Sequence, residues 1–162
     1  MDHSHIVTRF DKDLSEIESL LVEMADLVAK QISDSALALQ LGDNQLAKAV
    51  TKNDSKINRL EEKIDDKAIR LIALRQPMAE DLRSAITTLK VSNCLERMGD
   101  YAKTLSYRAR KVDDFSAMKS ILRSITETSE KIINMLNVVM EAYVNRDLNK
   151  AYDAREADQE IN

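Results

Sequence analysis

Apolar residues recur at alternating steps of three and four along most of this chain. One such stripe ends just before Gly42 and a second ends before Pro77, and two more follow toward the C-terminus. This spacing gathers the apolar side chains on one face of an α-helix and does not match the strict alternation of a strand. Only 2 glycines and 1 proline are present. The sequence therefore predicts an all-α fold of long helices, in which Gly42 ends the first helix and Pro77 starts the third.

A weak internal repeat organises these helices. Residues 42–58 align without gaps with residues 146–162, and the same register lays the first apolar stripe on the fourth. A repeated unit of this kind predicts tandem three-helix bundles. We expect residues 1–111 to form the first repeat and residues 112–162 a partial second one. In this register the last helix of the second unit would lie beyond Asn162, so the second repeat is expected to be truncated after the start of its second helix.

Charge and composition exclude several functional classes. The formal net charge is -4 and the pI is near 5.3, whereas a sequence-independent grip on nucleic acid requires a concentrated basic surface. A single cysteine, Cys94, cannot form an internal disulfide. Neither a signal peptide nor an apolar run of membrane-spanning length is found. We expect a cytoplasmic protein that binds no nucleic acid and reaches a membrane only through its partners.

Four oxygen-bearing side chains are the candidate site. Glu96 and Asp100 are four residues apart and so share one face of the third helix, where they prolong an apolar seam. Folding the second helix back on the third about Gln76 brings Asp54 to their level and Asn58 close by. Acids in a seam require a cation or hydrogen-bond donors. Their oxygen atoms suit Mg, Mn, Fe or Ca.

Ordinary ion pairs are the alternative explanation for these acids. Arg97, Lys52 or Lys103 could neutralise them between the helices, as often happens at the edge of a bundle. Gly99 lies inside the same helix, where glycine costs about 1 kcal/mol relative to alanine. Either the close approach of a neighbouring helix or room for a ligand would explain it.

The sequence does not predict an enzyme. Di-iron carboxylate proteins are also helical bundles with inward-facing acids, but they use Glu-x-x-His pairs. The only histidines here are His3 and His5, at the N-terminus, where a solvated tail is expected. Cys94 has no histidine base anchored by the sequence, and no phosphate-cradling glycine loop occurs.

Two segments resemble the signature of the PhoU family of phosphate-uptake regulators. They are Arg-Gln-Pro-Met-Ala-Glu-Asp-Leu-Arg at residues 75–83 and Leu-Glu-Arg-Met-Gly-Asp-Tyr-Ala at residues 95–102. The resemblance implies two similar three-helix bundles that bind metal ions, such as Mg, Mn, Fe or Zn, through an acid followed four residues later by aspartate. Glu96 and Asp100 match this motif. On the second helix, Asp54 matches the first position of this motif. Asn58 stands four residues later, at the second position, where an acid is frequent.

The resemblance also implies a function. Proteins of this kind are accessory proteins of the phosphate-specific transport system and negative regulators of phosphate uptake and phosphate-starvation signalling. They link the ATPase subunit of a phosphate ABC transporter to a sensor histidine kinase, and they are commonly homodimers. A metal-free helical adaptor or scaffold is the alternative, because amphipathic helices with charged outer faces need no ligand to fold.

Overall fold

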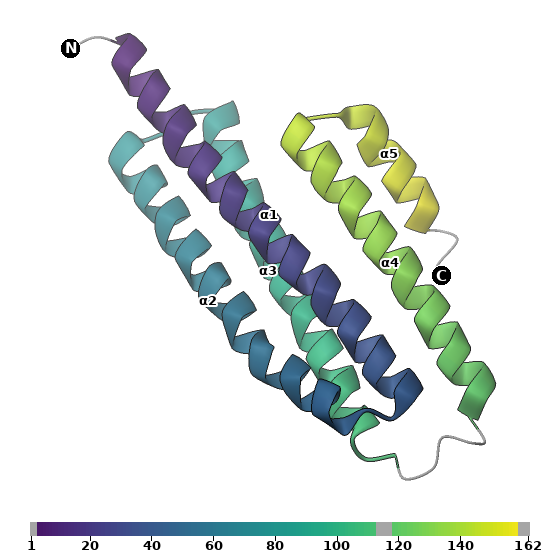
Figure 1. Cartoon of the computed structure of the whole chain (residues 1–162). Coiled ribbons are helices and arrows are strands. Elements are labelled where there is room, and N and C mark those ends of the chain that lie inside the picture. Colours follow the sequence, from purple (N-terminus) through teal and green to yellow (C-terminus); the bar gives the residue numbers. More distant parts are fainter. Residues whose placement is uncertain (1–2, 113–117, 159–162) are drawn as a thin grey trace.

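The computed structural model describes residues 3–112 and 118–158, and it contains five helices in this part of the chain (Figure 1). They are α1 (His3–Leu41), α2 (Asn44–Arg75), α3 (Glu80–Ala109), α4 (Lys119–Asn145) and α5 (Leu148–Ala157). The described residues contain no strand, so the predicted all-α fold is confirmed. The expected boundary at residue 111 stays a prediction, since residues 113–117 lie outside the described part.

Helices α1, α2 and α3 pack side by side as one bundle, and its core is the apolar stripe of α1 (Figure 1). Leu21, Met24 and Val28 are completely buried there. Ile64 from α2 and Ala85 from α3 complete this core without any exposed surface. Burying apolar area of this kind is the main term that stabilises a helical bundle. The bundle is therefore the rigid frame on which α2 and α3 present their polar residues.

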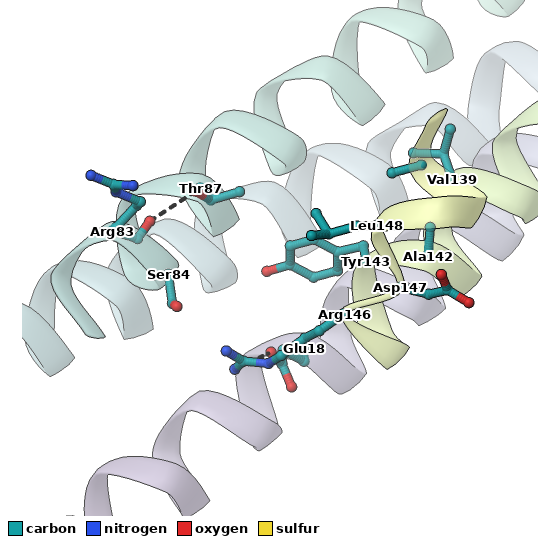
Figure 2. A pocket seen from close by; sticks show the side chains of 11 residues that line it. Glu18, Arg83, Ser84, Thr87, Val139, Ala142, Tyr143, Arg146, Asp147 and Leu148 are labelled. Carbon is teal, nitrogen blue, oxygen red and sulfur yellow. Dashed lines mark hydrogen bonds and ion pairs between the residues drawn. The ribbon is translucent and has the colours of Figure 1, made fainter. Parts of the chain in front are cut away.

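Helix α4 lies against α1, and α5 turns back along α4 on the side away from α2 (Figure 1). Two polar contacts attach α4 to the first bundle. The Tyr143 hydroxyl lies 2.9 Å from Oγ1 of Thr88, and burial raises the pKa of Tyr143. Arg146 lies 3.8 Å from Glu18 of α1. Tyr143, Arg146 and Glu18 border a cavity of about 470 Å³ at the α4–α5 turn (Figure 2).

The prediction of helix ends is confirmed at Gly42 and wrong at Pro77. Gly42 follows α1 with a φ of 64°, in the left-handed region that favours glycine at a helix end. Pro77 does not start α3, which begins at Glu80. Instead Gln76 ends α2 with a φ of 46°, and Ala79 has a φ of 50°. The chain reverses through these two residues with positive φ, and α3 begins directly after the second of them.

We expect Asp43→Ala to lower the free energy of unfolding by about 1 kcal/mol. Asp43 caps α2, and its Oδ1 accepts hydrogen bonds from the backbone N–H groups of Gln45 and Leu46 at 2.8 and 3.0 Å. Asp147 caps α5 in the same way, so Asp147→Ala is the matched variant on a shorter helix. Urea unfolding measures both changes. A loss of less than about 0.3 kcal/mol for Asp43→Ala would contradict a stabilising cap.

None of the described helices combines the length and the apolar character needed to cross a bilayer.

Candidate functional site

The hairpin of α2 and α3 brings two of the predicted acids together through a lysine. Lys103 donates hydrogen bonds to Oδ2 of Asp54, at 2.6 Å, and to Oδ1 of Asp100, at 3.2 Å. The two helices run antiparallel from the turn at residues 76–79, which places Asp54 at the level of α3 that the sequence predicted. The side chain of Asp54 is buried, whereas that of Asp100 is 51% exposed. The site therefore opens from the bundle interior toward solvent along α3.

A glutamine that the sequence analysis missed holds the inner side of this site. Nε2 of Gln31 donates to Oδ1 of Asp54 at 3.0 Å and to the backbone carbonyl of Gly99 at 3.0 Å. Gln31 is itself only 4% exposed. One side chain of α1 thus ties α2 and α3 together and fixes the orientation of the Asp54 carboxylate. Its signal in the sequence is a polar residue within the apolar stripe, three positions after Val28.

Gly99 allows the three helices to approach closely at this point. A Cβ atom on Gly99 would lie 3.0 Å from Cδ1 and 3.4 Å from Cγ2 of Ile57, and 3.7 Å from Nε2 of Gln31. Ile57 is only 1% exposed, so it has little space to retreat. Of the two explanations for Gly99, the geometry favours the close approach of a neighbouring helix.

Two glutamates extend the cluster of negative charge. Burial raises the pKa of Glu96, and the nearby carboxylates of Asp100 and Glu61 raise it further. Burial and then the charge of Asp65 raise the pKa of Glu61, a residue that lies on the Asp54 seam. Oδ1 of Asn58 is buried and accepts no hydrogen bond from the described residues. The cluster has more acceptor oxygens than donors, which suits a cation with oxygen ligands.

The acids are not arranged as a ready-made metal site. No three carboxylate, thiolate or imidazole groups among residues 3–112 and 118–158 are placed to hold one ion together; the side chains of His3 and His5 lie outside the description. Lys103 provides the ion pairs that the alternative explanation requires. Arg97 and Lys52 form none within the described chain. A metal ion at Asp54 and Asp100 would therefore have to share or replace the position of the Lys103 ammonium.

We expect Glu96→Gln to raise the melting temperature at pH 7 in metal-free buffer. Folding raises the pKa of Glu96 above its ordinary value of 4.5, so the ionised carboxylate destabilises the folded state. That penalty is absent below pH 4.5 and grows as the pH rises through the folded pKa. The advantage of the variant should therefore vanish in acid. Calorimetry between pH 3 and pH 8 measures it, with Glu62→Gln, at an exposed glutamate of α2, as control. Equal melting curves at pH 7 would contradict the assignment.

Comparisons with known proteins agree with this architecture. The family model described as "PhoU domain" matches residues 21–109, which include the whole α2–α3 cluster. A phosphate-specific transport system accessory protein PhoU homolog from Caulobacter vibrioides is 36% identical over 157 residues, covering 97% of this chain and 68% of the relative. Its counterpart from Clostridium acetobutylicum is 35% identical over 153 residues, covering 94% of this chain and 69% of that protein.

Solved structures show the same fold. The crystal structure of PhoU from Pseudomonas aeruginosa superposes with a TM-score of 0.85 at 31% identity, and the match covers 93% of this chain and 72% of that one. The PhoU structure from Streptococcus pneumoniae gives a TM-score of 0.84 at 26% identity, covering 93% of this chain and 70% of that one. The sequence pattern, the helical architecture and these relatives together place the chain in the PhoU family.

Proposed function

We propose that the chain is an accessory protein of the phosphate-specific transport system. In this role it represses phosphate uptake and phosphate-starvation signalling. The observation that carries this proposal is the acidic cluster of α2 and α3 inside the segment that matches the family, residues 21–109. Relatives that cover most of this chain carry the name of such an accessory protein. The proposed activity is binding and regulation and involves no chemical conversion of a substrate.

The cluster is the proposed metal site, with Asp54, Asn58, Glu96 and Asp100 as ligands. Support comes from the raised pKa of Glu96 and from the orphaned Oδ1 of Asn58, since both conditions are relieved by a nearby positive charge. A bound Mg, Mn, Fe or Zn ion would supply that charge and tie α2 to α3. Asn58 carries no charge of its own, so this ligand set should bind more weakly than one with an acid at position 58.

The proposed partners are the ATPase subunit of a phosphate ABC transporter and a sensor histidine kinase. Such a role places the protein in the cytoplasm, where it reaches the membrane only through those partners, and a homodimer would present two equivalent surfaces. Co-purification of the chain with each partner from cells grown in high phosphate tests the contacts. Gel filtration with light scattering tests the dimer.

Repression can be measured directly in cells. We expect the chain to restore low expression of a phosphate-starvation reporter at high phosphate in a host that lacks its own accessory protein. The double substitution Glu96→Gln with Asp100→Asn should abolish that repression while the protein remains helical and abundant. A reporter that stays fully active with the unchanged chain would contradict the proposed function.

A metal-free adaptor is the second candidate, and the closure of the site by Lys103 is the observation that favours it. In an adaptor, the acids serve only to pair with the lysine. The same double variant distinguishes the two functions: an adaptor would keep repression and partner binding unless its fold were lost, whereas a metal-dependent regulator would lose them with its fold intact.

A further inference from the structure

We propose that the outward face of α3 is a docking surface for an acidic helical segment of a partner protein. Four exposed basic residues form this surface, which we name the basic stripe: Arg83, Lys90, Arg97 and Arg108. The basic stripe takes no part in the acidic cluster between α2 and α3. The proposal therefore goes beyond the metal site and holds for either of the two candidate functions.

The spacing of the basic stripe puts its charges in one line along the helix. Arg83, Lys90 and Arg97 follow one another at steps of seven residues, and Arg108 comes eleven residues later. Steps of seven and eleven both return to nearly the same side of an α-helix, since one turn takes about 3.6 residues. The line is about 37 Å long, with about 10 Å between successive charges in its first part.

No carboxylate of the described chain forms an ion pair with a member of the basic stripe, whereas Lys103, on the side of α3 that faces α2, is held by two aspartates. Glu96 is the one acid between Asp81 and Asp100 on this helix, and it belongs to the acidic cluster. Helix α3 thus directs its acids toward α2 and its bases outward. Exposed charges about 10 Å apart are largely screened from one another at physiological ionic strength, so the stripe destabilises the free protein little.

The side chains beside the basic stripe favour a protein as the occupant. Tyr101 is 65% exposed and lies between Arg97 and Arg108 on the same face, and the Arg97 guanidinium donates a hydrogen bond to its hydroxyl at 3.4 Å. Ile86 is 41% exposed near the start of the stripe. Arginine and tyrosine are enriched in protein–protein interfaces, where they often contribute most of the binding energy.

Lipid and nucleic acid fit this surface less well. The exposed residues of α3 include no Trp, Phe or Leu, which are the side chains that anchor an interfacial helix in a membrane. The formal net charge of -4 opposes the approach of a nucleic acid, whose backbone demands a broad basic surface.

A helix with acidic side chains at the same spacing complements the basic stripe. Each of its carboxylates would face one basic residue, and the apolar atoms between them would pack on Tyr101 and Ile86. Three members of the stripe are arginines, which can bind a carboxylate through two parallel hydrogen bonds. Complementary charges of this kind speed association and fix the register of the partner.

A pair of synthetic helical peptides provides the probe. One peptide carries glutamates at the spacing of the basic stripe, and the other has the same composition with its glutamates distributed around the helix. Fluorescence anisotropy measures their binding to the full chain at low ionic strength. We expect the aligned peptide to bind at least about tenfold more tightly than the distributed one, and added salt to weaken its binding.

Two variants with equal net charge locate the binding surface. The stripe variant combines Arg83→Gln, Lys90→Gln, Arg97→Gln and Arg108→Gln. The control variant removes four exposed positive charges from the other helices: Lys12→Gln, Lys56→Gln, Lys131→Gln and Arg155→Gln. The stripe variant should bind the aligned peptide at least about tenfold more weakly than the unchanged chain, and the control variant less than about threefold more weakly. Circular dichroism checks that both are folded.

Every outcome of these titrations bears on the proposal. Loss of aligned-peptide binding in the stripe variant alone supports it. Equal losses in both variants, equal affinities for the two peptides, or no binding by the unchanged chain would overturn it. Phosphatidylserine-containing vesicles and a single-stranded oligonucleotide are titrated in parallel, and tighter binding of either one through the stripe would overturn the assignment to a protein partner. The reporter assay measures the proposed repression separately, so failure of either proposal leaves the other standing.

Discussion

Gly99→Val is expected to lower the free energy of unfolding by about 3 kcal/mol, at the upper end of the usual cost of overpacking a core. The new Cβ would lie 3.0 Å from Cδ1 of Ile57, and two further methyl groups would have to fit beside it. Ile57 is almost completely buried, so relief requires α2 and α3 to move apart. That movement would also stretch the bond from Gln31 to the Gly99 carbonyl, which holds Asp54 in place.

Guanidinium unfolding of Gly99→Val beside Gly99→Ala separates packing from helix propensity. Alanine gains about 1 kcal/mol of helix propensity over glycine and meets the same 3.0 Å contact without the extra methyl groups. Its net effect should therefore be much smaller than that of valine. If Gly99→Val were as stable as the unchanged chain, the helices would not be as close as the structure places them.

Lys103→Met is expected to cost about 3 kcal/mol of stability in metal-free protein, toward the lower end of the range for removing one partner of a buried ion pair. Asp54 is 3% exposed, and it would keep only the neutral donor Gln31. The cost stays below the maximum because Lys103 itself is partly solvated. Thermal or chemical unfolding in the presence of a chelator measures this effect.

The double variant Asp54→Asn with Lys103→Met is the control for this effect. Removing both charges should recover a large part of the loss, since no uncompensated charge remains buried. Additive losses in the double variant would mean that the two side chains do not interact, contrary to their 2.6 Å separation.

Local features of the fold were predictable because they depend on nearby residues. The apolar stripes predicted the helices, and Gly42 predicted the end of α1. The aspartate caps of α2 and α5 became visible only in the structure. Pro77 misled because proline is compatible both with a first helical turn and with the turn before it. Only the positive φ angles of Gln76 and Ala79 distinguish the two.

The candidate site was predictable in outline but not in its contacts. Residue spacing placed Asp54 near Asp100, because an antiparallel hairpin fixes which residues face each other. It could not choose among Arg97, Lys52 and Lys103 as the counter-charge. All three lie near the level of the acids along the helices, and only the packing of the side chains decides which one contacts them. Contacts from a third helix, such as that of Gln31, are set by tertiary arrangement: the sequence marks Gln31 as a polar residue within an apolar stripe but does not indicate its partners.

Metal analysis is the most direct test of the proposed site. The protein would be purified by gel filtration and its metal content measured by mass spectrometry, beside Asp54→Asn and the double variant of Glu96→Gln with Asp100→Asn. We predict a stoichiometric content of Mg, Mn, Fe or Zn in the unchanged chain, lost in the variants while their helicity is retained. Metal-free protein throughout, or equal metal content in every variant, would contradict the assignment of these acids as ligands.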